Sequence, residues 1–231
     1  MAETIAQKFV VQTENISRIL AGEVPVTLVK NASVAIGRGE FVAITGPSGS
    51  GKSSLLYMLG LLDQPTSGKI ILNGLDTTQM NDDQLADLRL AELGFVFQFH
   101  FLLPEFSALE NVMMPMQKLG CLSGANIKKR AEELLESLEL GDQAQKLPKQ
   151  LSGGQSQRVA IARAMANEPL LILADEPTGN LDTKSSVNVQ NILLEQAHTH
   201  NRTVIAVSHD MEFAKRADRV ITIVDGEIVK M

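Results

Sequence analysis

A glycine-rich loop that ends in a lysine and a serine carries the clearest chemistry in this sequence. Glycines let the backbone approach a ligand with its N–H groups turned inward, and a helix starting after the loop adds its positive end. The Lys52 ammonium can reach the β- and γ-phosphates of a nucleotide, while the Ser53 hydroxyl can ligate Mg²⁺. The alternative is a strand-to-helix turn without a ligand. The run fits the pattern G-x-x-x-x-G-K-[ST], and the expected nucleotide-binding residues are Gly46, Pro47, Ser48, Gly49, Ser50, Gly51, Lys52, Ser53 and Ser54.

Two adjacent carboxylates would supply the second half of such a site. Leu170–Ala174 is an apolar run of strand length, and Asp175 and Glu176 follow it directly. They would stand at the carboxyl edge of a sheet, where α/β proteins bind ligands. Asp175 would hold Mg²⁺ through its hydration shell, and Glu176 would orient and deprotonate an attacking water. Alone, such a pair is more often a solvated turn, and the lysine loop upstream is what favours catalysis.

A second anion-binding helix start is expected at the signature segment, Leu-Ser-Gly-Gly-Gln at residues 151–155. Ser152 fits the N-cap of a long helix, which leaves the amides of Gly153 and Gly154 exposed, with Gln155 next in the chain. Free amides at a helix start bind anions. Read in isolation, the segment could equally be an ordinary capped helix.

Strands alternate with helices along the chain, which predicts a mainly parallel sheet covered on both faces. Between about Phe99 and Asn167 the pattern becomes helical, and Ser107 with Glu110 forms a capping box there. The expected strands are Val24–Ile36, Glu40–Thr45, Lys69–Leu72, Gly94–Gln98, Leu170–Ala174, Thr203–Ser208 and Arg219–Val224. The expected helices include Lys52–Leu62, Ile127–Leu140 and Lys184–His198, and Asn73-Gly74 is a tight-turn signal.

Composition excludes several classes of function. The 231 residues carry a net charge of −6, which disfavours a nucleic-acid binder with a basic face. The single Cys121 cannot form an internal disulfide. No apolar run approaches the length of about 18 residues that a membrane helix needs, and Met1–Lys8 lacks the pattern of a signal peptide. We therefore expect a soluble chain, and any membrane pathway would come from another chain.

Together these motifs resemble the ATP-binding cassette (ABC) family of transport ATPases, from about Val10 to Met231. The resemblance implies one α/β domain over residues 1–231, with a RecA-like P-loop NTPase core and an N-terminal antiparallel β subdomain. The core with its β subdomain would span about 1–98 and 168–231. An inserted α-helical subdomain, about 99–167, would carry the signature segment. The implied cofactors are ATP and Mg²⁺.

The resemblance also assigns roles that the residues alone do not. Gln98 matches a glutamine that senses Mg²⁺ and the attacking water, and His209 matches a switch histidine on the γ-phosphate. The signature segment would bind the γ-phosphate held by a second copy of the chain, so that two ATP molecules lie between two copies. Asp182, in the loop Asn180–Asp182, would take part in communication between the two sites.

One position departs from the family pattern. Where related cassettes place an aromatic residue against adenine, this chain has Ile19. Tyr57 follows the glycine loop on its helix and is expected to pack against the sheet. Either the base contact is apolar, or Phe9 or another residue substitutes, so the preference for ATP over GTP stays open.

The sequence of residues 97–112 resembles that of the lipoprotein-releasing ATPases of Gram-negative inner membranes. The sequence of residues 173–182 is also similar in macrolide-exporter and cell-division relatives. The resemblance implies a peripheral protein at the cytoplasmic face of the inner membrane. Membrane subunits would dock near Phe99–Phe106, with a periplasmic adaptor or carrier reached through the complex. From composition alone, that phenylalanine-rich segment could equally be core of the helical insert. The chain would have no fused membrane domain.

Alternative functions remain at this stage. The first is the ATPase of a complex that exports a drug, peptide or lipid, and the second is a signalling ATPase in cell division. DNA-repair and translation cassettes are disfavoured, because the chain has neither a long coiled-coil insertion nor a second cassette. A cassette that binds ATP without hydrolysing it is disfavoured by the presence of Glu176, Gln98 and His209. Cargo, membrane partner and direction of transport are not determined.

Overall fold

The structure, a computed structural model, describes residues 8–231 and is built on a six-stranded sheet. Residues 1–7, which contain most of the segment tested for a signal peptide, lie outside this range. Strand order is β11-β10-β4-β9-β8-β7, parallel throughout except for β11, which pairs antiparallel with β10. The strands are β4 (Phe41–Thr45), β7 (Leu93–Phe97), β8 (Leu171–Asp175), β9 (Thr203–Val207), β10 (Arg219–Val224) and β11 (Glu227–Lys230).

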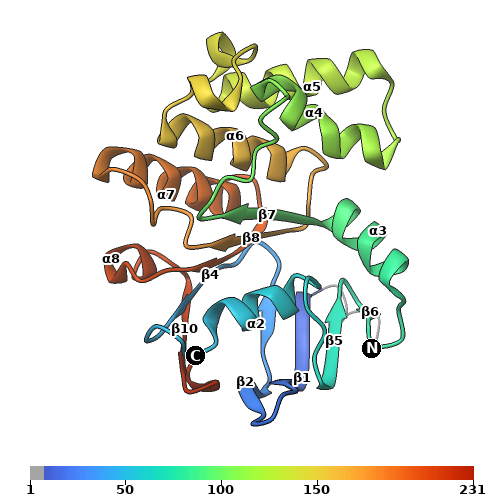
Figure 1. Cartoon of the computed structure of the whole chain (residues 1–231), viewed down its shortest axis with the longest axis vertical. Coiled ribbons are helices and arrows are strands. Elements are labelled where there is room, and N and C mark those ends of the chain that lie inside the picture. The colour runs from blue at the N-terminus through green and yellow to red at the C-terminus, as the bar shows by residue number, and fades with distance from the viewer. Residues whose placement is uncertain (1–7) are drawn as a thin grey trace.

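The parallel strands are apolar on both sides because both faces of the sheet are covered. On one face, residues such as Ile44, Leu173 and Ile205 pack with α2 (Lys52–Leu59). On the other face, their neighbours Ile172 and Val204 belong to a core shared with α6 (Gly153–Met165) and α7 (Thr183–His198). Figure 1 shows the resulting layers, with α2 on one side of the sheet and α6 and α7 on the other.

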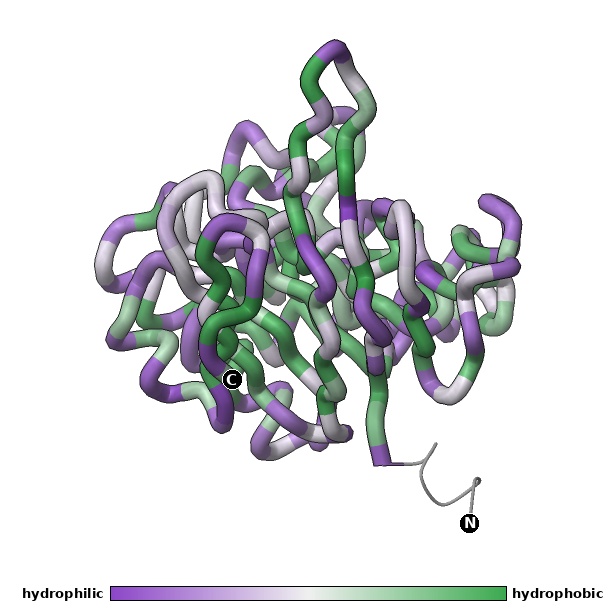
Figure 2. Tube along the Cα trace, turned by 90° about the horizontal axis from the view of Figure 1, so that it is seen from below, coloured by the Kyte–Doolittle hydropathy of each residue, from purple (hydrophilic) through white to green (hydrophobic). Residues whose placement is uncertain are grey.

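A second, antiparallel sheet lies beside α2, as the fold class predicted. It contains β1 (Phe9–Leu20), β2 (Val26–Ala32), β3 (Ala35–Gly37), β5 (Ser67–Leu72) and β6 (Leu75–Asp76). In Figure 2, β1 and β2 extend away from the body of the chain as a hairpin. The turn signal is confirmed, because Asn73 and Gly74 have φ angles of 48° and 79° between β5 and β6, both in the left-handed region that such turns require.

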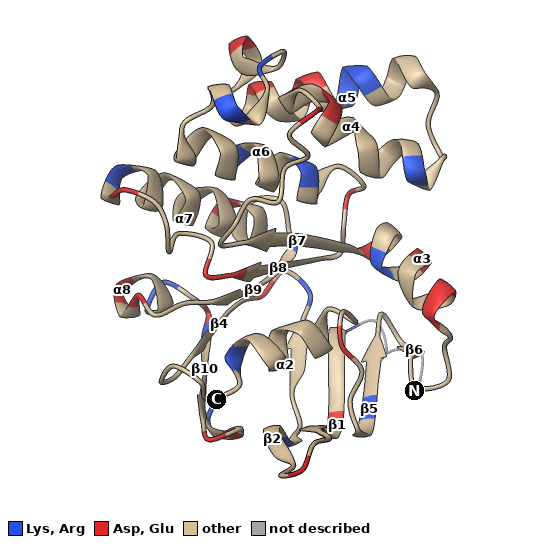
Figure 3. Cartoon of the chain, viewed as in Figure 1, with Lys and Arg blue, Asp and Glu red and all other residues tan. Residues whose placement is uncertain are grey.

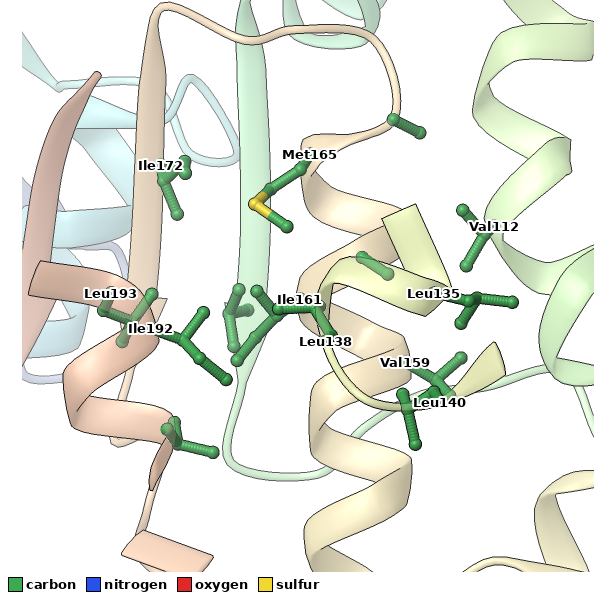
Figure 4. Packing of buried hydrophobic residues seen from close by; sticks show 14 of the residues in the cluster. Val112, Leu135, Leu138, Leu140, Val159, Ile161, Met165, Ile172, Ile192 and Leu193 are labelled. Atoms are coloured by element: carbon green, nitrogen blue, oxygen red, sulfur yellow. The ribbon is translucent and has the colours of Figure 1, made fainter. Parts of the chain in front are cut away.

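A helical block lies between β7 and β8. It consists of α4 (Ala108–Leu119), α5 (Gly124–Ser137), the short 3₁₀ turns η1 (Gly141–Gln143) and η2 (Pro148–Gln150), and α6. The expected capping box at Ser107 and Glu110 starts α4. Figure 4 shows why the block is held to the sheet: Val112, Leu135 and Val159 continue one core that reaches Ile172 of β8.

Several expected elements differ from the structure. The range 24–36 divides into β2 and β3, and the expected helix 52–62 ends at Leu59, because Gly60 caps it and Leu61 turns to a φ of 57°. The helix α3 (Asp82–Glu92) was not expected, since it buries only Leu85. The short helix α8 (Met211–Ala214) was also missed.

Gly94 sets how closely α6 approaches β7. A Cβ at this position would overlap the carbonyl oxygen of Ala164 and lie 3.2 Å from Pro169 Cγ. We expect Gly94→Ala to lower the free energy of unfolding by about 1–3 kcal/mol, because the overlapping atoms are backbone and cannot swing aside. The matched control is Gly124→Ala, where nothing lies within 4 Å of the added carbon. Urea unfolding of both variants tests this, and equal midpoints would contradict it.

Candidate functional site

The glycine loop joins β4 to α2 and folds around the side chain of Lys52. The Lys52 Nζ donates to the carbonyl of Pro47 at 2.7 Å, and the side chain is almost completely buried. Gly51 adopts a φ of 98° and lies against β2, where a Cβ would overlap the Leu28 carbonyl oxygen. The Ser50 Oγ is buried without a hydrogen-bond partner. Such a polar group costs free energy unless something bonds it, which fits a loop built for a ligand.

Two carboxylates at the end of β8 provide negative charge beside this lysine. Figure 3 shows the basic start of α2 and the acidic end of β8 toward the same edge of the sheet. Burial lowers the pKa of the Lys52 ammonium, while the charges of Glu176 and Asp175 act in the opposite direction. The expected pairing of the lysine loop with the Asp-Glu strand end is therefore present in space.

Asp175 receives one hydrogen bond on each oxygen, and both donors come from α2. Ser53 Oγ donates to Oδ1 at 2.9 Å, and the Tyr57 hydroxyl donates to Oδ2 at 2.6 Å. A hydroxyl and a carboxylate are the oxygen ligands that suit Mg²⁺, which is usually held by one or two carboxylates together with substrate phosphates. Within residues 8–231 no cluster of three His, Cys, Asp or Glu could hold a metal by itself. The Ser53 hydroxyl and the Asp175 carboxylate therefore fit a Mg²⁺ ion that is bound together with a nucleotide.

Glu176 and His209 meet at the edge of the sheet. His209 Nε2 lies 2.7 Å from Glu176 Oε1, and both side chains are partly exposed. Glu176 has a φ of 45°, a left-handed conformation that is strained for a residue with a side chain. Its backbone N–H donates to Val207 O at 3.1 Å, which holds the residue at the end of β9. The arrangement places a carboxylate that could accept a proton next to an imidazole.

Gln98 follows β7 and faces the loop after β8. Its Nε2 donates to Asn180 Oδ1 at 3.2 Å, and a Cβ at Gly179 would lie 2.7 Å from the same nitrogen. The contact connects Gln98 to the loop that leads to Asp182. Its assignment as a Mg²⁺ ligand stays a prediction.

The start of α6 has the capped form expected for the signature segment. Ser152 Oγ accepts from Gln155 N at 3.2 Å, and Gln155 Oε1 accepts from Ser152 N at 2.9 Å. Asp182 caps α7 with its carboxylate, which accepts from the backbone N–H and the hydroxyl of Ser185, and these hydrogen bonds lower the pKa of its carboxyl group. A pocket of about 290 Å³ opens between the two helix starts; its lining residues include Ser152, Gly154, Gln155, Arg158, Lys184 and Ser185. None of its lining residues belongs to the glycine loop.

Tyr57 is the site residue that sequence reasoning missed. Its ring meets Phe97 edge-on, with centroids 6.4 Å apart, so it does lie against the sheet as expected. Its hydroxyl bond to Asp175 was not predicted. Burial, followed by that hydrogen bond, raises the pKa of Tyr57 to about 12. The available signal was the spacing, since Tyr57 is four residues after Ser53 and so lies on the same face of α2.

The hairpin of β1 and β2 presents apolar side chains near the glycine loop. Ile19, Leu20 and Val26 are all exposed, and Ile19 pairs with Thr27, next to the Leu28 carbonyl that Gly51 contacts. Phe9 pairs with Gly37 instead, at the opposite end of β1. This geometry favours an apolar base contact over a contact from Phe9.

The aromatic segment Phe99–Phe106 lies on the surface. Phe99 and Phe101 are each 63% exposed, and Leu103 and Phe106 about 40%, so the interpretation of this segment as core of the helical insert is wrong for these side chains. An apolar groove of about 330 Å³ lies beside the segment; its lining residues include Leu62, Leu90, Phe95, Phe97, Pro115 and Arg163. In the described range, residues 8–231, no helix combines the length and apolar character needed to cross a membrane.

A phosphate-binding loop at the end of one parallel strand, with two carboxylates at the end of another, defines a P-loop nucleotide-binding protein. The family model described as ABC transporter matches residues 29–179. The chain belongs to this family, and it is an ATP-binding and ATP-hydrolysing cassette.

Relatives and solved structures agree with this assignment. A lipoprotein-releasing system ATP-binding protein, LolD 1 of Chlorobium chlorochromatii, is 52% identical, with 87% of this chain and 82% of that protein covered. The macrolide export ATP-binding/permease protein MacB of Bartonella quintana is 50% identical over 94% of this chain but only 33% of its own length. The dimeric post-hydrolysis structure of the cassette MJ0796 with ADP and Pi superimposes with a TM-score of 0.88, at 42% identity, covering 95% of this chain and 97% of that one.

Removal of the Lys52 ammonium tests the phosphate site. We expect Lys52→Ala to weaken ATP binding by about 10- to 100-fold, because a charge-assisted hydrogen bond contributes about 1.5–3 kcal/mol. The control is Lys215→Ala, which removes an exposed lysine paired with Glu212. Calorimetric titration with ATP measures both affinities, and retained affinity in Lys52→Ala would argue against the phosphate-binding assignment.

Proposed function

We propose that the chain is the ATPase subunit of a complex that releases lipoproteins from the inner membrane. It works as a peripheral subunit at the cytoplasmic face and dimerises around two ATP molecules. The observation that carries the proposal is an exposed aromatic segment placed beside an ATP site, in a chain 52% identical to a lipoprotein-releasing ATPase. Residues about 1–98 and 168–231 form the catalytic core with its β subdomain, and about 99–167 the helical subdomain that carries the signature segment.

The site residues divide the work of hydrolysis. Lys52 and the amides of the glycine loop bind the β- and γ-phosphates. Ser53, Asp175 and Gln98 would hold Mg²⁺, which when bound offsets phosphate charge. Glu176 orients and deprotonates the attacking water, a role worth about 10²–10⁴ in rate. His209, which contacts Glu176 at 2.7 Å, holds the attacking geometry at the γ-phosphate.

A second copy completes each site. Ser152, Gly153, Gly154 and Gln155 of one copy bind the γ-phosphate held by the other, and Asp182 takes part in communication between the two sites. The separate pocket at the signature segment and the dimeric MJ0796 structure support this arrangement. ATP then holds the two copies together, and hydrolysis replaces it with products that repel each other, so the γ-phosphate controls a two-state clamp.

Membrane subunits dock at the aromatic segment and its groove. Large exposed apolar patches mark interaction surfaces, and a groove of this kind accepts an apolar helix. Closure of the clamp would then move the membrane chain, with a periplasmic adaptor or carrier acting through the complex. Efflux is the second candidate, because MacB matches over 94% of this chain.

Glu176→Gln tests the chemistry. We expect turnover to fall by about 10²- to 10⁴-fold while ATP still binds, because the amide cannot accept a proton. A stable dimer should then form with ATP and Mg²⁺, which size-exclusion chromatography detects. Unchanged turnover would remove Glu176 from the role of base.

Purification of tagged Glu176→Gln from its own detergent-solubilised membranes with ATP tests the partners. Two related membrane subunits with large periplasmic domains, carrying bound lipoprotein, are the expected result. One membrane subunit with a periplasmic adaptor would favour efflux, and no membrane partner would overturn the transport proposal.

The same purification tests the docking surface. Phe99→Ser with Phe101→Ser should lose the membrane subunits and keep the ATP-dependent dimer. Leu122→Ser, which changes an exposed apolar residue between α4 and α5, should keep both. Equal recovery of partners with both variants would place docking elsewhere.

A further inference from the structure

Tyr57 makes two contacts that connect the nucleotide site to the surface. It is the only tyrosine in a chain without tryptophan. Its hydroxyl donates to Asp175 Oδ2 at 2.6 Å, which is short for a hydrogen bond between oxygen atoms and typical of a charged acceptor. Its ring meets Phe97 edge-on. One side chain therefore touches both the carboxylate proposed for Mg²⁺ and the strand that leads to Gln98.

The hydroxyl fixes the direction of the Asp175 carboxylate. Ser53 holds the other oxygen, but the proposed role of the Ser53 hydroxyl is to ligate Mg²⁺. If Ser53 held Mg²⁺ instead, the Tyr57 hydroxyl would still donate to Asp175. Partners that orient a ligand in this way tune metal affinity, and their loss costs about 10- to 100-fold.

The ring is the first member of a row of aromatic contacts. Phe97 meets Phe101 edge-on, with centroids 5.4 Å apart, and Phe101 lies 6.4 Å from Phe99. Phe95 also stacks on Phe97, with centroids 5.8 Å apart and planes within 7°. Phe97 therefore contacts both Tyr57 and Phe101, so a change in how Phe101 packs alters the surroundings of the ring that Tyr57 meets.

We propose that Tyr57 is a positioning residue that orients Asp175 toward Mg²⁺ and joins it through Phe97 to the exposed aromatic segment. The link to membrane subunits rests on the proposed function, while the orientation of Asp175 does not. The isolated chain therefore tests the orientation, and the complex tests the link.

Tyr57→Phe, made in the Glu176→Gln background, is the first test. It keeps the ring and removes only the hydroxyl. We expect ATP binding without Mg²⁺ to be unchanged, and the Mg²⁺ concentration needed for half-maximal dimerisation to rise by about 10- to 100-fold. Lys215→Ala is the control, because it changes only an exposed side chain paired with Glu212 and should leave the Mg²⁺ requirement within about threefold. An unchanged Mg²⁺ requirement in Tyr57→Phe, with a normal unfolding midpoint, would overturn the orientation.

Tyrosine emission gives a direct readout, because Tyr57 is the only contributor. A hydroxyl bonded to a carboxylate emits weakly, so Asp175→Asn should raise the emission. Equal emission from Asp175→Asn and the parent chain would show that the contact is absent in solution.

The link is tested in the complex with its membrane subunits. Stimulation of ATP hydrolysis by those subunits should fall in Phe97→Leu at saturating Mg²⁺, with the KM for ATP and the recovery of the membrane subunits unchanged. Full stimulation in Phe97→Leu would overturn the link and leave the orientation of Asp175 standing. If no membrane subunits are recovered with any variant, that result would instead count against the proposed function.

Discussion

The burial of the Lys52 ammonium beside two carboxylates is the interaction on which the rest of the structure depends. A buried charge is tolerated only when it is hydrogen-bonded and balanced. The Pro47 carbonyl provides the bond, and Asp175 and Glu176 provide the balancing charge. They can do so only because β4 and β8, separated by β9, run parallel and end at one edge of the sheet. The same lysine can also balance the charge of a nucleotide. The negative phosphates of the nucleotide would arrive together with a bound cation.

The two faces of the sheet carry different parts of the molecule. The face toward α2 carries the glycine loop, while the opposite face joins α6 and α7 in one core. Asp182 caps α7, and a Cβ at Gly154 would lie only 2.5 Å from Ser185 Oγ, so the starts of α6 and α7 are closely fitted to each other. The starts of α2 and α6, both suited to anions, belong to opposite faces of the sheet. In the proposed arrangement, one ATP contacts both kinds of helix start because a second copy supplies the α6 start.

Local signals allowed much of the fold to be predicted, because neighbours in sequence decide them. The Asn73-Gly74 turn, the capping box at Ser107 and the N-cap at Ser152 are examples. The helix α3 was not predicted, because tertiary contacts hold it and its sequence has almost no apolar face. At the site, the loop and strand-end residues follow from motifs. The bonds of Tyr57 with Asp175 and of Gln98 with Asn180 join residues 118 and 82 positions apart, and they depend on which strands are neighbours. No local pattern contains that information.

The aromatic segment is more than an exposed patch, because its backbone is bound to α6. Arg163 donates to His100 O at 2.9 Å and to Phe101 O at 2.7 Å, and Gln157 donates at 3.1 Å to Phe97 O, two residues before the segment. Burial lowers the pKa of the Arg163 guanidinium, which gives these bonds a poorly solvated setting where breaking them is costly. A push on the segment is thus resisted at Arg163 in the last turn of α6, the helix whose first residues form the signature segment. The same push is felt at Tyr57 through Phe97. In the proposed dimer, a segment held to α6 by Arg163 and to Phe97 by Phe101 can report one event to both parts of a shared ATP site, and packed elements of this kind switch between discrete arrangements rather than bend.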